Sequence, residues 1–405
     1  MNEDKNFNDI KIKRPSILWY WFPALFFRVF NRFYFGQRIK KDWKFKGLKG
    51  PVLAIANHST QLDVLLDLPA LLPKRYNMVT GKDVYMWKSL RPFVKAFGCI
   101  PKSQGAVDVM GMKLIKAAVE KGRNIIIYPE GKTSLDGKNL ANMGVGVAKF
   151  IKFLDCNVVS LKTMGAFLTR PRFSKHERRG RLETSVDVLY TAEELKKASP
   201  KDVYAKVCDA LSFNDNIWQR ENKVRFKSKA PAENLNYILY KCPKCGAEYE
   251  MTSDGNTLRC GSCANAVTYT QYGQLITHGD SVAFDRIDLW TDFEREELRK
   301  EISQGNFYLS KPVEYFVQDM EKMEMVLRGT GELYIDDTHI GYKGTCDGQE
   351  YEEKTELKNL STIITKTKEG VDLMFDDVIH RYMFAEKKWS TKYCFAVEQH
   401  YDLKR

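Results

Sequence analysis

The sequence predicts an α/β fold in its N-terminal half, followed by a small four-cysteine segment and a mostly-β C-terminal module. Three observations support this: strand-like and helical patterns alternate up to residue 163, two Cys-x2-Cys pairs lie within residues 242–263, and short alternating runs follow Gly329. A chain of 405 residues is too long for one ordinary core and predicts two or three domains. Hydrophobic residues at 43% suffice for globular burial, so bulk disorder is not expected.

Apolar strand patterns and amphipathic helical patterns alternate through the first half of the chain. Short apolar runs, several of them β-branched, predict strands at 51–57, 77–80, 124–128 and 157–163. Apolar residues at helical spacing predict helices at 62–71, 84–97, 106–121 and 145–153. This alternation is typical of an α/β layer architecture, but the order of the strands cannot be read from it.

The pattern changes beyond a polar stretch at residues 213–238, which we interpret as a domain boundary. A helix is expected over 291–302, starting with a capping box formed by Thr291 and Glu294. Short alternating runs then predict strands at 331–344, 351–357, 361–366, 371–375 and 378–384. A terminal helix from about residue 390 places four residues on one stripe, namely Trp389, Tyr393, Val397 and Tyr401. In pattern alone, strands closed by such a helix resemble a pleckstrin-homology-like module.

Basic residues are in excess and are concentrated in the first half of the chain. The net charge of +12 favours an anionic partner, which could be a membrane surface, a phosphorylated substrate or nucleic acid. Between Lys5 and Lys49, twelve Lys or Arg residues face only Asp9 and Asp42. A second basic cluster comprises Arg170, Arg172, Lys175, Arg178, Arg179 and Arg181. Composition does not choose among the three kinds of partner.

The N-terminal segment, residues 1–40, combines aromatic and basic side chains. Its most apolar part, 16–27, contains Pro23 and ends at Arg28, well short of the roughly twenty apolar residues needed to span a bilayer. We see no secretory signal. Aromatic rings interleaved with cations suit the headgroup boundary of a membrane. The alternative is a helix that packs on the protein's own core. The two interpretations are compatible if one face of the helix contacts the membrane and the other packs on the core.

A histidine and an aspartate stand where the first expected strand gives way to a helix, in Asn57-His58-Ser59-Thr60-Gln61-Leu62-Asp63. Histidine is the side chain best suited to act as a general base near neutral pH, because its unperturbed pKa is about 6.5. Asp63 can hold one ring nitrogen of His58 and fix the tautomer. The sequence has no Gly-x-Ser-x-Gly elbow and no cysteine beside His58, so a nucleophile mechanism lacks a candidate.

A second signal, Tyr128-Pro129-Glu130-Gly131-Lys132-Thr133-Ser134, ends the strand expected at 124–128. In this order and at this distance, the two signals resemble the glycerolipid acyltransferase superfamily over roughly the first half of the chain. The resemblance implies a mixed sheet flanked by helices and direct acyl transfer without a covalent enzyme intermediate. It implies that His58 is the base and Asp63 its orienting carboxylate. It also implies an acceptor-binding loop made by Glu130, Gly131 and Lys132.

The sequence departs from the family pattern at three places. The family continues its second signal with Thr-Arg-Ser, whereas this chain has Lys132-Thr133-Ser134, which moves the cation one place. Gln104 stands where the family has an arginine, and Lys102 is the candidate substitute. Ser160 stands where the family has a proline; nearby, Lys162 and Arg170 are candidate phosphate contacts.

Four of the nine cysteines form a tetrad, Cys242, Cys245, Cys260 and Cys263, in which fourteen residues separate two Cys-x2-Cys pairs. Four thiolates at this spacing predict a closed, structural zinc site, with rubredoxin-like iron as the alternative. The other five cysteines show no pairing pattern, which fits a reducing cytoplasm.

These observations predict an interfacial segment at 1–40, an acyltransferase domain at 41–225, a zinc ribbon at 238–272 and a β-rich module at 285–405. We expect a peripheral protein at the cytoplasmic face of a membrane. Its expected function is to transfer a fatty acyl group from acyl-CoA or acyl carrier protein to 1-acylglycerol 3-phosphate or a related lysophospholipid.

Two other functions stay open. A non-catalytic membrane adaptor on the same scaffold is favoured by Gln104 and opposed by the presence of His58, Asp63 and Glu130. Nucleic-acid binding is the third hypothesis, because zinc ribbons are frequent in nucleic-acid proteins; the acidic residues Glu248, Glu250 and Asp254 oppose it.

Overall fold

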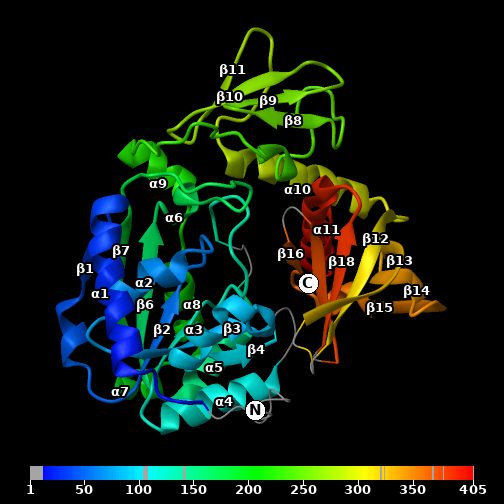
Figure 1. The fold of residues 1–405 in the computed structure, drawn as a ribbon. Helices are drawn as coiled ribbons and strands as arrows, with labels where there is room; N and C mark the ends of the chain where they lie inside the picture. The colour runs from blue at the N-terminus through cyan, green and yellow to red at the C-terminus, as the bar shows by residue number, and fades with distance from the viewer. Residues whose placement is uncertain are drawn as a thin grey trace. The chain divides into compact units, whose positions relative to one another are not determined.

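The computed structural model describes residues 12–103, 108–139, 143–319, 322, 324–366, 369–376 and 378–404. The chain forms two compact units, one made mainly of residues up to Lys227 and the other mainly of Ser228–Arg405 (Figure 1). Gln104, the residue at the position of the family's arginine, lies outside the described residues.

The first unit is built on a seven-stranded mixed sheet in the order β1-β7-β6-β2-β5-β3-β4. Neighbouring strands run parallel except β6 and β7, which are antiparallel. The strands are β1 (Arg38–Lys41), β2 (Val52–Ala56), β3 (Tyr76–Gly81), β4 (Ile100–Lys102), β5 (Asn124–Ile127), β6 (Asn157–Met164) and β7 (Glu183–Tyr190). The predicted mixed sheet is therefore confirmed.

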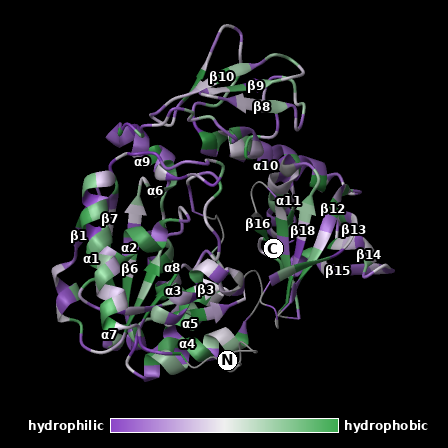
Figure 2. Cartoon of the chain, in the orientation of Figure 1, coloured by the Kyte–Doolittle hydropathy of each residue, from purple (hydrophilic) through white to green (hydrophobic). Residues whose placement is uncertain are grey.

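Helices cover both faces of this sheet, whose centre is hydrophobic (Figure 2). The described helices of this unit are α1 (Ile17–Tyr34), α2 (Asp63–Leu71), α3 (Arg91–Ala96), α4 (Val109–Glu120), α5 (Gly146–Leu154), α6 (Ala166–Thr169), α7 (Ala192–Lys197), α8 (Pro200–Leu211) and α9 (Asp215–Asn222). Along β2, Ala54 joins the core under α1 and α2, whereas Leu53 and Ile55 join the core under α4, α5 and α8. Because both faces are covered, the strand reads as an uninterrupted apolar run.

The prediction of a single helix over residues 84–97 is wrong. Two short 3-10 turns, Lys82–Met86 and Lys88–Leu90, precede α3 instead. Pro92 explains the break, because proline lacks a backbone N–H and is tolerated only in the first turn of a helix. The sequence analysis also missed the edge strand β1, which is short and charged, and its neighbour β7.

The second unit contains a four-stranded antiparallel ribbon and a seven-stranded antiparallel sheet. The ribbon has the order β11-β10-β9-β8, with β8 (Met251–Asp254), β9 (Thr257–Cys260), β10 (Ala266–Tyr269) and β11 (Leu275–Thr277). The sheet has the order β15-β14-β13-β12-β18-β17-β16, with β12 (Leu309–Asp319), β13 (Glu324–Ile335), β14 (His339–Cys346), β15 (Gln349–Glu356), β16 (Ile364–Lys366), β17 (Gly370–Phe375) and β18 (Val378–Phe384). The predicted β-rich C-terminal region is confirmed, although β12 was not foreseen. The pleckstrin-homology-like module stays a prediction.

Two helices accompany this sheet, α10 (Ile287–Ser303) and α11 (Ser390–Leu403). The predicted capping box is wrong, because α10 begins four residues before Thr291 and the hydroxyl of Thr291 donates to the carbonyl of Asp288 inside the helix. The side chain of Glu294 is buried and accepts the backbone N–H of Lys241. The last helix, α11, is buried around most of its surface and not along one stripe. In the part of the chain that the structure describes, no helix combines the length and the apolar character that crossing a membrane requires.

Candidate active site

The end of β2 is fixed by the side chain of Asn57. Its amide nitrogen donates to the carbonyl of Thr163 on β6 at 3.1 Å and its amide oxygen accepts the backbone N–H of the same residue at 2.9 Å. The amide nitrogen also donates to the Ser59 hydroxyl at 2.8 Å. These bonds hold the chain where it leaves the sheet, so that His58 and the start of α2 have a defined direction.

The structure brings His58 and Asp63 together as predicted. Asp63 is the first residue of α2, and its Oδ2 lies 2.8 Å from Nδ1 of His58. The same oxygen accepts the backbone N–H groups of Ser59 at 2.8 Å and Thr60 at 3.1 Å. An oxygen surrounded by donors assigns the ring proton to Nδ1 and leaves Nε2 as the acceptor. Within the described part of the chain, no protein group hydrogen-bonds to Nε2.

The surroundings of this pair keep the imidazole neutral. Burial lowers the pKa of His58 to about 4; the charge of Glu130 opposes this effect and that of Arg172 adds to it. The side chain of His58 keeps 22% of its surface exposed, whereas that of Asp63 keeps 3%. Burial raises the pKa of Asp63, and the N–H groups of Thr60 and Ser59 act against that rise. At neutral pH the ring is therefore unprotonated and ready to accept a proton.

The predicted acceptor loop lies directly beside the histidine. The carboxylate of Glu130, 7% exposed, accepts the backbone N–H of His58 at 3.1 Å, and Ser134 donates its N–H to the carbonyl of His58 at 2.8 Å. Gly131 has a φ of +71°, a conformation that favours glycine, and its N–H closes a turn onto the carbonyl of Tyr128. Two signals far apart in the sequence thus form one site.

The predicted cationic contacts are spread over the first unit and differ in their surroundings. Lys132 is 5% exposed, and burial lowers the pKa of Lys102. The ammonium group of Lys162 lies 3.4 Å from the carbonyl of Ser212. Arg170 pairs with Glu177 at 2.8 Å, and its carbonyl accepts the hydroxyl of Thr60, which lies between His58 and Asp63 in the sequence. None of these contacts involves the imidazole itself.

Arg172 was not among the predicted site residues, although it belongs to the second basic cluster of the sequence. Its guanidinium group donates at 3.4 Å to the carbonyl of Thr133, which directly follows the predicted acceptor loop. It also lowers the pKa of His58 through its charge. The signal that could have found it is its place shortly after β6, whose end the sequence analysis had linked to the site.

An apolar hollow of about 230 Å³ lies between α1 and α2. Its lining residues are Phe27, Phe30, Asn31, Tyr34, Phe35, Leu62, Leu65, Leu66 and Glu177. Leu62 directly precedes Asp63, so one wall of the hollow belongs to the helix that carries Asp63. An apolar space in this position can take up a segment of hydrocarbon chain.

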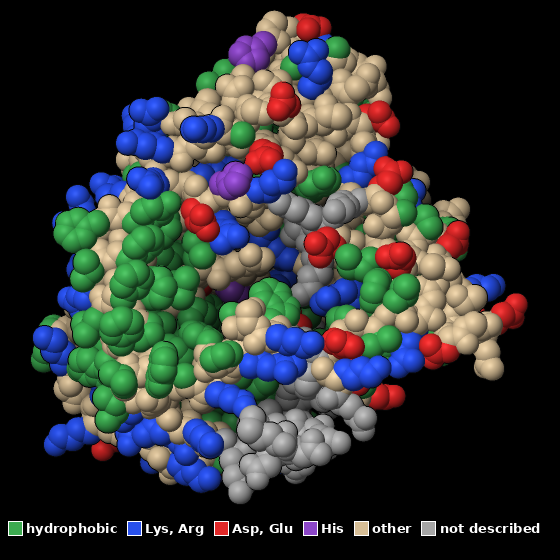
Figure 3. Space-filling view, in the orientation of Figure 1, with side chains coloured by type: hydrophobic (Ala, Val, Ile, Leu, Met, Phe, Trp, Pro, Cys, Tyr) green, Lys and Arg blue, Asp and Glu red, His purple; other side chains and the backbone are tan. Residues whose placement is uncertain are grey.

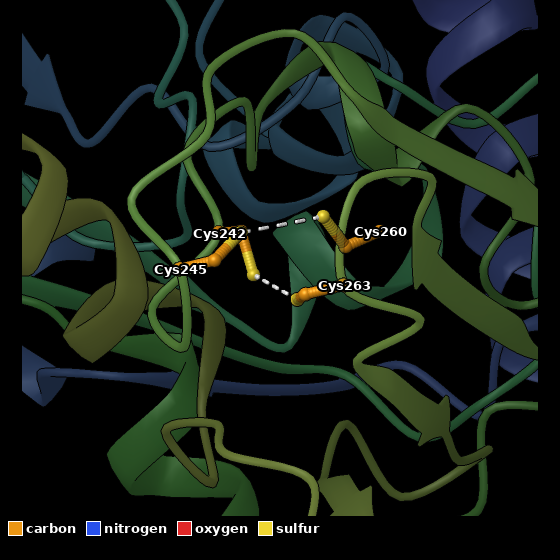
Figure 4. A group of neighbouring side chains, drawn as sticks. All are labelled: Cys242, Cys245, Cys260 and Cys263. Atoms are coloured by element: carbon orange, nitrogen blue, oxygen red, sulfur yellow. Dashed lines mark hydrogen bonds between the residues drawn. The ribbon is translucent and has the colours of Figure 1, made fainter.

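The cysteine tetrad of the second unit forms one compact group (Figure 4). Its four sulfur atoms all lie within 4.8 Å of one another, with 3.7 Å between Cys242 and Cys263 and 3.8 Å between Cys245 and Cys260. A tetrahedral ion with metal–sulfur bonds of about 2.3 Å would place its sulfur atoms about 3.8 Å apart. The amide of Asn265 lies 3.7 Å from the sulfur of Cys242 and adds a polar neighbour. The tetrad therefore fits a tetrahedral metal ion.

A known protein family matches the part of the chain that contains both sequence signals. Residues 32–162 match the family model described as Acyltransferase. This match confirms the resemblance of the first half of the chain to acyltransferases.

Among solved structures, the 1-acyl-sn-glycerophosphate (LPA) acyltransferase PlsC from Thermotoga maritima is similar, with 16% identity and a TM-score of 0.39. The match covers 52% of this chain and 81% of that one. At these values, the similarity carries no argument about substrate or mechanism. No curated protein matches the chain.

Proposed function

We propose that this protein transfers a fatty acyl group from acyl-CoA or acyl carrier protein to the free hydroxyl of 1-acylglycerol 3-phosphate or a related lysophospholipid. The observation that carries the proposal is the imidazole of His58, which lies beside the loop of Glu130 and Gly131. Asp63 holds its Nδ1, and its Nε2 has no hydrogen-bond partner among the described residues. A base in this state accepts a proton from an alcohol.

The proposed reaction needs no covalent enzyme intermediate. Nε2 of His58 takes the proton of the acceptor hydroxyl while the hydroxyl oxygen attacks the carbonyl carbon of the thioester. The tetrahedral intermediate collapses, the carbon–sulfur bond breaks, and the thiolate leaves with the proton returned by His58. Asp63 stabilises the imidazolium ion that forms between the two proton transfers.

The acceptor's phosphate is proposed to meet the basic side chains around this loop. Arg172 lies against Thr133, and Lys132 is part of the loop itself. A planar guanidinium group can bind two phosphate oxygens at once, which a lysine cannot. Arg172 thus offers the kind of cation that the family carries at the position of Gln104.

An acylation assay tests this function. Purified protein with its metal content measured is incubated with labelled acyl-CoA, or with acyl carrier protein, and a panel of lysolipids that includes uncharged monoacylglycerol. We expect product with an acceptor that bears a phosphate and little product with monoacylglycerol. If no acceptor in the panel is acylated by sound protein, the non-catalytic adaptor becomes the better account.

The proposed partner surface is a membrane, contacted by one face of α1. The opposite face packs on the core through Tyr20 and Ala24, whereas Phe33, Leu18 and Phe22 are 85%, 71% and 69% exposed. Hydrophobic side chains form a broad patch over this helix (Figure 3). Continuous exposed apolar surface of this kind marks an interaction site, and a helix beside basic residues suits an anionic lipid surface. Together with the cysteine usage, this supports a peripheral location at the cytoplasmic face.

Charged substitutions on α1 test the membrane contact. Phe22→Glu and Phe33→Glu should each lower the binding to vesicles of anionic phospholipid by about tenfold or more, because each removes a large apolar side chain from the lipid and adds repulsion. Co-sedimentation with vesicles measures the bound fraction. Ile217→Glu is the matched control, since Ile217 is an exposed apolar residue on α9. Equal binding by all three variants and the wild type would contradict the proposed contact.

The metal proposed for the cysteine tetrad is zinc. Four thiolates without an open position provide a structural site, and such a site stabilises a ribbon whose own core is small. Rubredoxin-like iron is the alternative.

A further inference from the structure

A second buried carboxylate lies one helical turn beyond Asp63. Asp67 is 1% exposed, and residues four apart on a helix share one face. Both of its oxygens have donors: the hydroxyl of Tyr128 lies 2.8 Å from Oδ2, and the hydroxyl of Thr163 lies 3.1 Å from Oδ1. Asp67 therefore links α2 to the end of β5 and to β6. Burial and the neighbouring charge of Asp63 raise the pKa of Asp67, and the hydrogen bonds from Tyr128 and Thr163 act against that rise.

The tyrosine bound to Asp67 also contacts the catalytic imidazole. The rings of Tyr128 and His58 stack, with their centroids 4.5 Å apart and an angle of 30° between the planes. Tyr128 directly follows β5 and precedes the loop that holds Glu130. Its ring thus covers one face of the imidazole, while its hydroxyl is anchored to the helix that carries Asp63.

The geometry of His58 explains why this contact matters. The hydrogen bond from Nδ1 to Asp63 fixes one edge of the ring but leaves the ring free to tilt about that bond. A flat side chain against the face of the ring opposes the tilt. It also excludes water from that face, and burial is the main cause of the low pKa of His58.

We propose that Asp67 and Tyr128 are positioning residues for His58: the tyrosine ring sets the plane of the imidazole, and the carboxylate of Asp67 sets the tyrosine. In the proposed acyl transfer, on which this inference rests, they aim Nε2 at the acceptor hydroxyl. Neither residue touches the reacting atoms. The arrangement extends the catalytic pair to four side chains, drawn from α2, from the end of β2 and from the end of β5.

Three variants separate the parts of this arrangement. Tyr128→Phe keeps the ring but removes the hydrogen bond to Asp67. Asp67→Asn replaces the carboxyl group that accepts this bond with an amide, and Tyr128→Leu removes the ring. Tyr204→Phe is the matched control, because the hydroxyl of Tyr204 donates to the carbonyl of Met143 at 2.6 Å in the core on the other side of the sheet. The unfolding midpoint of every variant is measured alongside.

In the acylation assay, Tyr128→Phe and Asp67→Asn should each lower kcat by about tenfold or more with little change in KM, as residues that orient a catalytic group do. Tyr128→Leu should lower kcat further, and Tyr204→Phe should match the wild type. Wild-type kcat in Tyr128→Leu, or losses in all variants that only follow their unfolding midpoints, would overturn the inference.

A measurement that needs no turnover separates this inference from the proposed function. The pKa of His58 is followed by NMR titration of protein with labelled histidine, with the signal assigned from His58→Ala. It should stay near 4 in Tyr128→Phe and rise in Tyr128→Leu toward the ordinary value of about 6.5, because water then reaches the ring. An unchanged pKa in Tyr128→Leu would overturn the positioning role even in an active enzyme. A raised pKa in a protein without acyltransferase activity would support the geometry and refute the function.

Discussion

Replacing His58 with alanine is expected to lower the rate of acyl transfer by about a thousandfold or more, with the unfolding midpoint near that of the wild type. The variant loses the only group placed to take the proton of the acceptor, whereas Asp63 keeps its bonds from the backbone of Ser59 and Thr60. Initial rates with labelled acyl-CoA measure the loss, and thermal unfolding measures the stability. His278→Ala, a substitution of an exposed histidine, is the control.

Two related results would complete this test. Asp63→Asn should lower kcat by about a hundredfold to ten-thousandfold, because the amide can stabilise the wrong tautomer of His58. In the wild type, kcat/KM should be constant above about pH 5 and fall as the pH drops through 4. The sign follows from the depressed pKa of His58: the ring is neutral above about pH 4 and loses its function as a base when it is protonated below it. Retained activity in His58→Ala would refute the mechanism.

Removal of the metal from the cysteine tetrad is expected to unfold the ribbon of β8 to β11. Metal binding and folding are coupled in small ribbons of this kind, where a structural zinc ion contributes about 10 kcal/mol or more in peptides. We expect close to one zinc ion per chain, measured by elemental analysis. Cys260→Ser should lose most of it, whereas Cys208→Ser, outside the tetrad, should keep it. Iron in place of zinc would be visible as coloured protein.

The effect of metal loss should extend beyond the ribbon within the second unit. Lys241, next to Cys242, pairs with Glu301 of α10 at 3.1 Å, and Lys392 of α11 pairs with Glu248 at 2.7 Å and with Glu301 at 3.2 Å. These pairs connect the metal-binding segment to both helices. Amide hydrogen exchange after chelation should therefore rise strongly in the ribbon and more weakly in α10 and α11. Unchanged protection after complete removal of the metal would refute a structural role.

The errors of the sequence analysis have identifiable physical causes. The helix predicted over 84–97 failed at Pro92, a signal that was present in the sequence. The capping box failed because the pattern of Thr291 and Glu294 is local, whereas Glu294 meets the backbone of Lys241, more than fifty residues away. The strands β7 and β12 were missed because partly buried strands carry polar residues at many positions, which weakens their apolar signal.

The sequence alone determined the two chemical centres, because their members are close together along the chain. His58 and Asp63 are five residues apart at a strand-to-helix junction, and each Cys-x2-Cys pair forms one turn, so local backbone geometry already brings the groups together. Only the tertiary structure decided what surrounds the imidazole. Glu130, Tyr128 and Arg172 reach it from other strand ends and loops, and Asp67 acts through Tyr128. Such contacts depend on how the sheet and its helices pack, and no spacing in the sequence encodes that packing.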